Sequence, residues 1–182
     1  STSIILILGF ANLFADGFSM AVGKYSSDKA DLEEFELIKN TEYKHLKEKP
    51  EHERDEIREI MENYGFKGKD LKKAVEIITS NDDVWVDMMM RHEFNMTKEN
   101  INPLYGGFAT FASFLLIGFI PLMAYVFKDL FSGIDIFFLT CVFTSVALFI
   151  VGAVKSRFTS RNWFLCGLET AIIGGLAAGI AY

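Results

Sequence analysis

The sequence has few of the residues that build soluble catalytic or redox sites. Its two cysteines, Cys141 and Cys166, lie in apolar stretches without CxxC spacing, so we expect packed thiols rather than a metal or redox pair. It has no P-loop, no glycine-rich nucleotide fingerprint and no Ser/His/Asp arrangement in a helical context. We therefore expect neither an enzyme nor a bound prosthetic group.

Charge is almost missing from four long stretches, which hold only Asp16, Asp135 and Glu169. The stretches are residues 1–23, 104–127, 134–154 and 162–182. About 20 apolar residues in a helix cross the hydrocarbon core of a bilayer, so each stretch is long enough to span it. A soluble globular domain is excluded, and the pattern predicts an all-α, polytopic helical membrane protein.

The short loops predict the orientation, because Lys and Arg collect on the cytoplasmic side of membrane proteins. Residues 155–161 carry three basic residues, whereas residues 128–133 carry one, which Asp129 offsets. Counting back through the helices places residues 24–103 in the cytoplasm, in either a plasma membrane or a vacuole-like membrane. The chain begins without Met or a signal-peptide pattern and stops inside an apolar run, so we expect a fragment.

Residues 24–103, here called the insert, separate one predicted membrane helix (1–23) from three others (104–182). The insert holds 14 of the 18 basic residues, 20 of the 24 acidic residues and all three histidines. Its net charge of −6 suits a cation and argues against nucleic acid. Helices are predicted at residues 26–48 (continuing the first membrane helix), 51–64, 69–79 and 82–94.

Three of these helices carry possible metal ligands on faces that should pack together. Glu42 and His45 continue an apolar stripe, and Glu53 with Glu56 precedes a second one. The helix at 82–94 places Trp85, Met88, Met89, His92 and Glu93 on one side. Carboxylate and imidazole groups bind first-row divalent ions, and thioethers disfavour Mg²⁺ and Ca²⁺. The alternative is a solvated helical bundle in which Met fills gaps in the core.

The first apolar helix carries a polar line of its own. Asn12, Asp16 and Met20 follow one another at i, i+4 and i+8, and Lys24 continues the line. A carboxylate in hydrocarbon costs about 2.5–3.5 kcal/mol on insertion scales, so it marks an ion pathway or a buried pair. The alternative is an interfacial or protonated aspartate.

Several segments together resemble the vacuolar iron transporter family over nearly the whole chain. They are the run ADGFSMAVGKYSS at 15–27, the acidic insert, MMMRHE at 88–93, Asn102-Pro103-Leu104 and the glycine-rich last helix. The resemblance implies a five-helix membrane protein that dimerises and exports Fe²⁺, and often Mn²⁺, from the cytosol in exchange for protons. Relative to that family, we expect the first membrane helix to be missing from this fragment, and Lys24 stands where Glu is common.

The resemblance also implies roles for individual residues. Met20 would line the membrane pathway, and His45 stands where the family usually has Glu. The implied insert ligands are Glu42, Glu53, Glu56, Met89, Met90 and Glu93.

The leading hypothesis is a proton-coupled exporter of Fe²⁺ or Mn²⁺. The insert captures the ion, which then follows a pathway near Asp16 and Met20. Two alternatives stay open. One is a membrane-tethered di-iron oxidase of ferritin-like type, suggested by the spacing of Glu42 and His45, although such sites usually need two Glu-x-x-His pairs. The other is a non-transporting membrane scaffold whose insert binds a protein partner.

Overall fold

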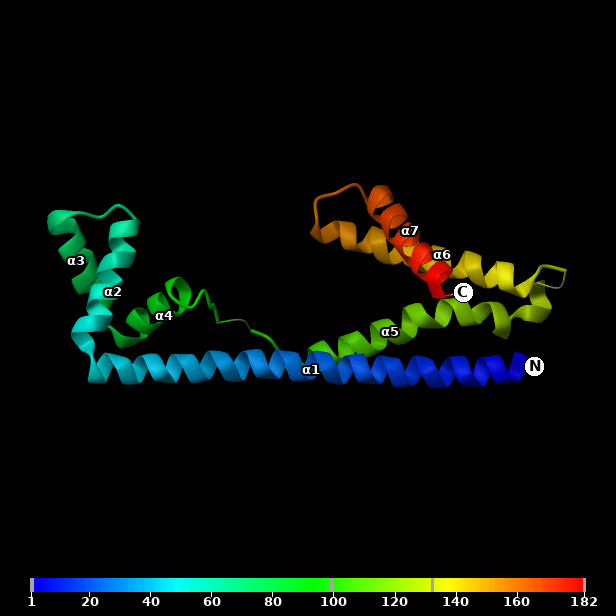
Figure 1. Ribbon diagram of the computed structural model, residues 1–182, viewed down its shortest axis with the longest axis horizontal. Helices are drawn as coiled ribbons and strands as arrows, with labels where there is room; N and C mark the ends of the chain where they lie inside the picture. The colour runs from blue at the N-terminus through cyan, green and yellow to red at the C-terminus, as the bar shows by residue number, and fades with distance from the viewer. Residues whose placement is uncertain (1, 99, 132, 182) are drawn as a thin grey trace. The chain divides into compact units, whose positions relative to one another are not determined.

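The computed structural model describes residues 2–98, 100–131 and 133–181, and every regular element in these ranges is helical (Figure 1). The α-helices are α1 (Thr2–Glu48), α2 (Pro50–Asn63), α3 (Gly68–Thr79), α4 (Asp82–His92), α5 (Pro103–Val126), α6 (Ile136–Lys155) and α7 (Trp163–Ala181). Two short 3₁₀ helices are η1 (Lys128–Phe131) and η2 (Ser156–Phe158). Within the described residues, four helical segments are long and apolar enough to cross a membrane: Thr2–Glu48, Pro103–Val126, Ile136–Phe158 and Trp163–Ile180. The predicted all-α membrane fold is confirmed.

The chain forms two compact units. The membrane unit consists of Ser1–Lys24 with Gly107–Tyr182, and the insert unit consists of Tyr25–Gly106. Helix α1 supplies residues to both units, because its 47 residues continue without a break from the apolar N-terminal part into the charged part.

Glycines allow the helices of the membrane unit to pack closely. A Cβ atom added to Gly9 of α1 would lie 2.6 Å from Leu122 of α5, and one added to Gly167 of α7 would lie 2.7 Å from the Phe149 ring of α6. Small residues bring helix backbones together in this way where hydrophobic burial gives no driving force between helices. Helices α6 and α7 form a hairpin (Figure 1).

Two of the three charges in the apolar stretches have local partners in the structure. Asp135 caps α6, because its Oδ1 accepts hydrogen bonds from the backbone N–H groups of Phe137 and Phe138 at 2.7 and 3.3 Å. Glu169 of α7 pairs with Arg161, with 3.0 Å between Oε2 and Nη1. Asp135 therefore stabilises the start of α6, and Glu169 ties α7 to the loop that precedes it.

The helices of the insert unit begin and end where local chemistry requires. Pro50 opens α2, and its fixed φ suits the first helical turn. Gly65 ends α2 with a φ of +93°, a left-handed conformation that glycine adopts without strain. Asn81 caps α4 by accepting hydrogen bonds from the N–H groups of Asp83 and Val84.

A hydrophobic core joins the four helical segments of the insert unit. Its buried members are Leu46 from α1, Ile57 and Met61 from α2, Val75 from α3, and Trp85, Val86, Met89 and Met90 from α4. A polar contact supports the same packing, because the Tyr43 hydroxyl of α1 donates a hydrogen bond to Asp83 of α4 at 2.5 Å. That bond is the main reason why the pKa of Tyr43 is raised to about 12.

Candidate metal site in the insert

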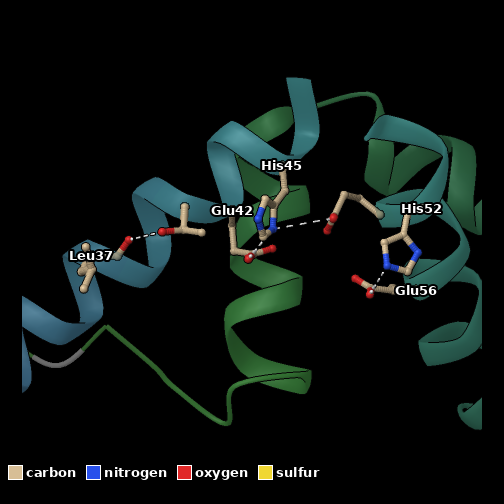
Figure 2. A network of polar contacts seen from close by, with 7 residues as sticks. Leu37, Glu42, His45, His52 and Glu56 are labelled. Atoms are coloured by element: carbon tan, nitrogen blue, oxygen red, sulfur yellow. Dashed lines mark hydrogen bonds and ion pairs between the residues drawn. The ribbon is translucent and has the colours of Figure 1, made fainter. Parts of the chain in front are cut away.

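The sharp turn between α1 and α2 brings two acidic faces together. Lys49 alone separates the two helices, so the chain changes direction sharply within a single residue (Figure 1). As a result, Glu42 and His45 of α1 face Glu53 of α2, and the His45 ring lies beside both carboxylates (Figure 2). The imidazole Nδ1 lies 3.3 Å from Glu42 Oε1 and 3.8 Å from Glu53 Oε1. These three residues are called the inner cluster below.

Both carboxylates of the inner cluster are buried. Glu42 is 2% exposed and Glu53 is 3% exposed, whereas the side chain of His45 is 38% exposed. Glu42 Oε2 is buried without a hydrogen-bond partner. A buried polar atom normally finds a partner, and an unpaired one costs about 1–3 kcal/mol, or more when it is charged. An oxygen in this position suits a cation.

A cavity of about 170 Å³ opens beside the inner cluster. We call it the acidic cavity, and its walls are Glu42, His45, Lys49, His52, Glu53, Glu56, Glu93 and Phe94. A neighbouring cavity of about 270 Å³ is lined by Glu56, Glu59, Ile60, Asn63, His92 and Glu93. Glu56 and Glu93 belong to both walls, so acidic side chains continue from one cavity to the next.

Burial and mutual repulsion make these carboxyl groups hold protons tightly. The pKa of Glu42 is raised first by burial and then by the charge of Glu93, while His45 acts in the opposite direction. Burial is also the first cause of the raised pKa of Glu53. Glu93 is exposed at the cavity wall, and partial loss of solvent there is the first cause of its raised pKa. The charge of Glu56 raises both pKa values further. A hydrogen bond between Glu53 and Glu56 also raises the pKa of Glu53, and such a bond requires a proton on one of the two carboxyl groups.

The inner cluster has the chemistry and the spacing of a divalent-metal site. Each residue offers one ligand atom, and these atoms all lie within 4.8 Å of one another. Zinc-type ions sit about 2.0–2.2 Å from nitrogen and carboxylate oxygen, so two ligands of one ion are separated by at most about 4.4 Å. Side-chain shifts of a few tenths of an ångström would bring all three donors onto one ion.

Comparison with known proteins agrees with a metal-handling chain. A sequence model of the VIT family matches residues 1–182. The chain belongs to the VIT family.

Three relatives illustrate this membership, and each is named a vacuolar iron transporter. The chain is 33% identical to vacuolar iron transporter 1 of Oryza sativa subsp. japonica, over all of this chain and 71% of that protein. It is 31% identical to vacuolar iron transporter 1 of Arabidopsis thaliana, over all of this chain and 72% of that protein. It is 33% identical to the vacuolar iron transporter of Plasmodium falciparum (isolate 3D7), over 97% of this chain and 67% of that protein. The resemblance inferred from the sequence is confirmed.

The structure places five of the predicted insert ligands of this VIT-family chain on one cavity wall: Glu42, His45, Glu53, Glu56 and Glu93. It places Met89 and Met90 elsewhere. Met89 is fully buried and Met90 is 2% exposed, and both belong to the hydrophobic core rather than to the wall of the acidic cavity. Their assignment as ligands stays a prediction, and it would require the core to rearrange.

The predicted pathway residues lie on the apolar part of α1, in the membrane unit. Asp16 is exposed and Met20 is 52% exposed. The neighbouring residues Leu13 and Gly17 are buried, with Leu13 against Gly118 of α5 and Gly17 against Phe114. Asp16 and Met20 therefore stay available for other partners of the VIT-family chain, and their role in transport stays a prediction.

Three residues of the cavity wall were not expected from the sequence: Lys49, His52 and Phe94. His52 pairs with Glu56, with 3.6 Å between Nε2 and Oε1, and the i, i+4 spacing of the two could have indicated it. Lys49 and Phe94 have no comparable pattern, because each reaches the wall through the local path of the backbone.

Proposed function

We propose that this protein moves Fe²⁺, and also Mn²⁺, out of the cytosol in exchange for protons, and that the insert captures the ion first. The relatives named vacuolar iron transporters support iron as the cargo and a vacuole-like membrane as the location. The four apolar helical segments support an integral membrane protein. The basic loop at 155–161 supports a cytoplasmic insert.

One observation carries the capture step. Glu42 places a buried oxygen without a partner next to a second buried carboxylate and an imidazole nitrogen. Two ionised carboxylates in this environment repel each other and lack the hydration they would have in water. A divalent cation removes both penalties at once, because it supplies two positive charges to two negative ones.

The same carboxylates give a physical basis for proton exchange. Glu42, Glu53 and Glu93 have raised pKa values, so each binds a proton more readily than an exposed glutamate does. A metal ligand must be deprotonated, so metal binding releases these protons and acid returns them. Exchange of a divalent ion for protons needs this competition between metal and protons for the same carboxylates. In the membrane, Asp16 and Met20 form the proposed pathway.

Transport by the full chain in proteoliposomes tests the proposal. The measurements are anaerobic Fe²⁺ uptake and the internal pH, reported by a trapped dye, with an imposed proton gradient. We expect uptake coupled to proton movement, with a strong loss in the double variant Glu42→Gln, Glu53→Gln. The matched control is Glu33→Gln, which removes an exposed carboxylate of α1 that pairs with exposed Lys29. Uptake equal in the double variant and the control would refute capture by the inner cluster.

The same preparation tests partners and the membrane pathway. We propose that the working unit is a homodimer, and crosslinking in the bilayer tests this. Asp16→Asn should reduce Fe²⁺ uptake while leaving metal binding by the insert unchanged, because Asp16 belongs to the membrane unit. Equal loss of uptake and of binding would contradict a separate role for Asp16.

A further inference from the structure

His45 gives the inner cluster a donor that differs in kind from its neighbours. Two of the three ligand atoms are carboxylate oxygens, and the third is an imidazole nitrogen, of which Nδ1 faces both carboxylates. We infer that His45 sets the metal preference of the inner cluster, favouring Fe²⁺ and Co²⁺ over Mn²⁺ and disfavouring Mg²⁺ and Ca²⁺. This inference rests on the proposed function, because it assumes that the inner cluster holds the transported ion.

The donor types provide the first argument. Oxygen-only sites suit Mg²⁺, Ca²⁺ and Mn²⁺, whereas imidazole suits iron, nickel, copper and zinc. The thioethers of Met89 and Met90 lie in the hydrophobic core and do not line the acidic cavity, so they supply no soft donor there. The nitrogen of His45 is therefore the donor that favours Fe²⁺ and Co²⁺ over Mn²⁺, Mg²⁺ and Ca²⁺.

Charge provides the second argument. Glu42 and Glu53 together match the two charges of a divalent ion, and a neutral imidazole completes the set without adding a third negative charge. A third carboxylate at position 45 would leave a net negative charge beside two side chains that are 2% and 3% exposed. Such an excess attracts every divalent cation by charge and strengthens the preference for the later transition metals less than an imidazole nitrogen does.

The position of the ring provides the third argument. Nδ1 already points toward both carboxylates, at 3.3 and 3.8 Å, so the imidazole needs little reorientation to join them on an ion. His52, the other histidine on the cavity wall, is placed differently. Its side chain is 67% exposed, and its Nε2 faces Glu56 rather than the inner cluster.

Competitive binding to the full chain in detergent tests the inference. Co²⁺ and Mn²⁺ are titrated separately at one pH, and the ratio of their dissociation constants is compared among the native chain, His45→Glu and Glu33→Gln. Changes at or around metal ligands alter affinity by about 10–100-fold, and loss of an imidazole nitrogen weakens Co²⁺ more than Mn²⁺, so we expect His45→Glu to lower the preference for Co²⁺ by about tenfold. Glu33→Gln should leave the ratio within about twofold of the native value, because that exposed carboxylate does not line the acidic cavity.

Spectroscopy gives a readout that does not depend on any variant folding. Mn²⁺ bound to the native chain should show electron spin echo modulation from a directly coordinated ¹⁴N nucleus. An unchanged Co²⁺/Mn²⁺ ratio in His45→Glu, or no nitrogen modulation in the native chain, would overturn the inference while leaving capture by the carboxylates intact. No binding of either metal to the native chain would overturn both the inference and the capture step of the proposed function.

Discussion

Replacing Glu42 by glutamine should stabilise the insert when no metal is present and destabilise it, relative to the native chain, when metal is saturating. Glu42 is 2% exposed, and its Oε2 has no hydrogen-bond partner. Leaving such a group unpaired costs about 1–3 kcal/mol. Glutamine keeps the shape and one buried polar oxygen but removes the charge and its repulsion by Glu93, so we expect the free energy of unfolding to rise by about 1–2 kcal/mol at pH 7.5 without metal.

Metal reverses the order of the two proteins. A ligand present at about 100 times its dissociation constant stabilises the folded state by about 2.7 kcal/mol. The native chain should gain this stabilisation, whereas Glu42→Gln should lose most of it with its carboxylate ligand. The two unfolding curves should therefore exchange places when Mn²⁺ is added.

Trp85 provides the assay, because it is buried in the core of the insert unit. The chain has two tryptophans, so a Trp163→Phe background leaves Trp85 as the sole tryptophan emitter. With urea slopes of about 1–3 kcal/mol per molar, the expected gain moves the unfolding midpoint upward by about 1 M. Glu33→Gln is the control, since exposed substitutions usually change stability by less than about 0.5 kcal/mol.

The stability advantage of Glu42→Gln should depend on pH, because Glu42 gains a proton as the pH falls. The pKa of Glu42 is raised above its ordinary value of 4.5, so the folded chain binds the proton more tightly than the unfolded chain does. The resulting stability is fully present below pH 4.5 and is lost as the pH rises through the higher pKa of the folded state. The advantage of Glu42→Gln should therefore shrink as the pH falls toward 4.5. A glutamine variant that is less stable than the native chain at pH 7.5 without metal would refute the reasoning.

Three further substitutions test other parts of the structure. Met89→Leu should leave Mn²⁺ affinity unchanged in a titration, because Met89 lies in the core, and a tenfold loss would instead show that it is a ligand. Tyr43→Phe should lower the urea stability of the insert by about 1 kcal/mol by removing the hydrogen bond to Asp83, and should abolish the tyrosine that ionises near pH 12 in an absorbance titration. Gly167→Val should weaken the α6–α7 hairpin by about 1–3 kcal/mol through its clash with the Phe149 ring, measured as a lower melting temperature in detergent.

The sequence was sufficient for features that depend on local chemistry. Long apolar runs predict the membrane-spanning helices, because an α-helix makes its backbone hydrogen bonds within the segment and crosses the hydrocarbon core in about 20 residues. Pro50, Gly65 and Asn81 set helix ends in the insert by the geometry of single residues. These effects need no knowledge of neighbouring helices.

The sequence did not show how deeply each residue of the insert is buried. Helical spacing placed Met89 and Glu93 on the same side of α4, and a side says nothing about distance along the axis. Four residues of helix advance about 6 Å, which separates a fully buried Met89 in the core from an exposed Glu93 on the cavity wall. Similarly, Glu53 and Glu56 share a face, but only Glu53 is deeply buried, because the turn at Lys49 fixes which part of α2 meets α1.

The burial of Glu42 and Glu53 links the stability of the insert to the metal capture proposed for it. A glutamate at the surface would keep its water, cost the fold nothing and bind a cation weakly. A buried pair loses that water and gains much more from a cation, so affinity increases with the cost of the empty arrangement. The adjacent core of Ile57, Met61 and Trp85 provides stability that offsets this cost. A metal site built from buried acids should therefore persist in a chain whose core is more stable. It should be lost in a chain whose core is less stable.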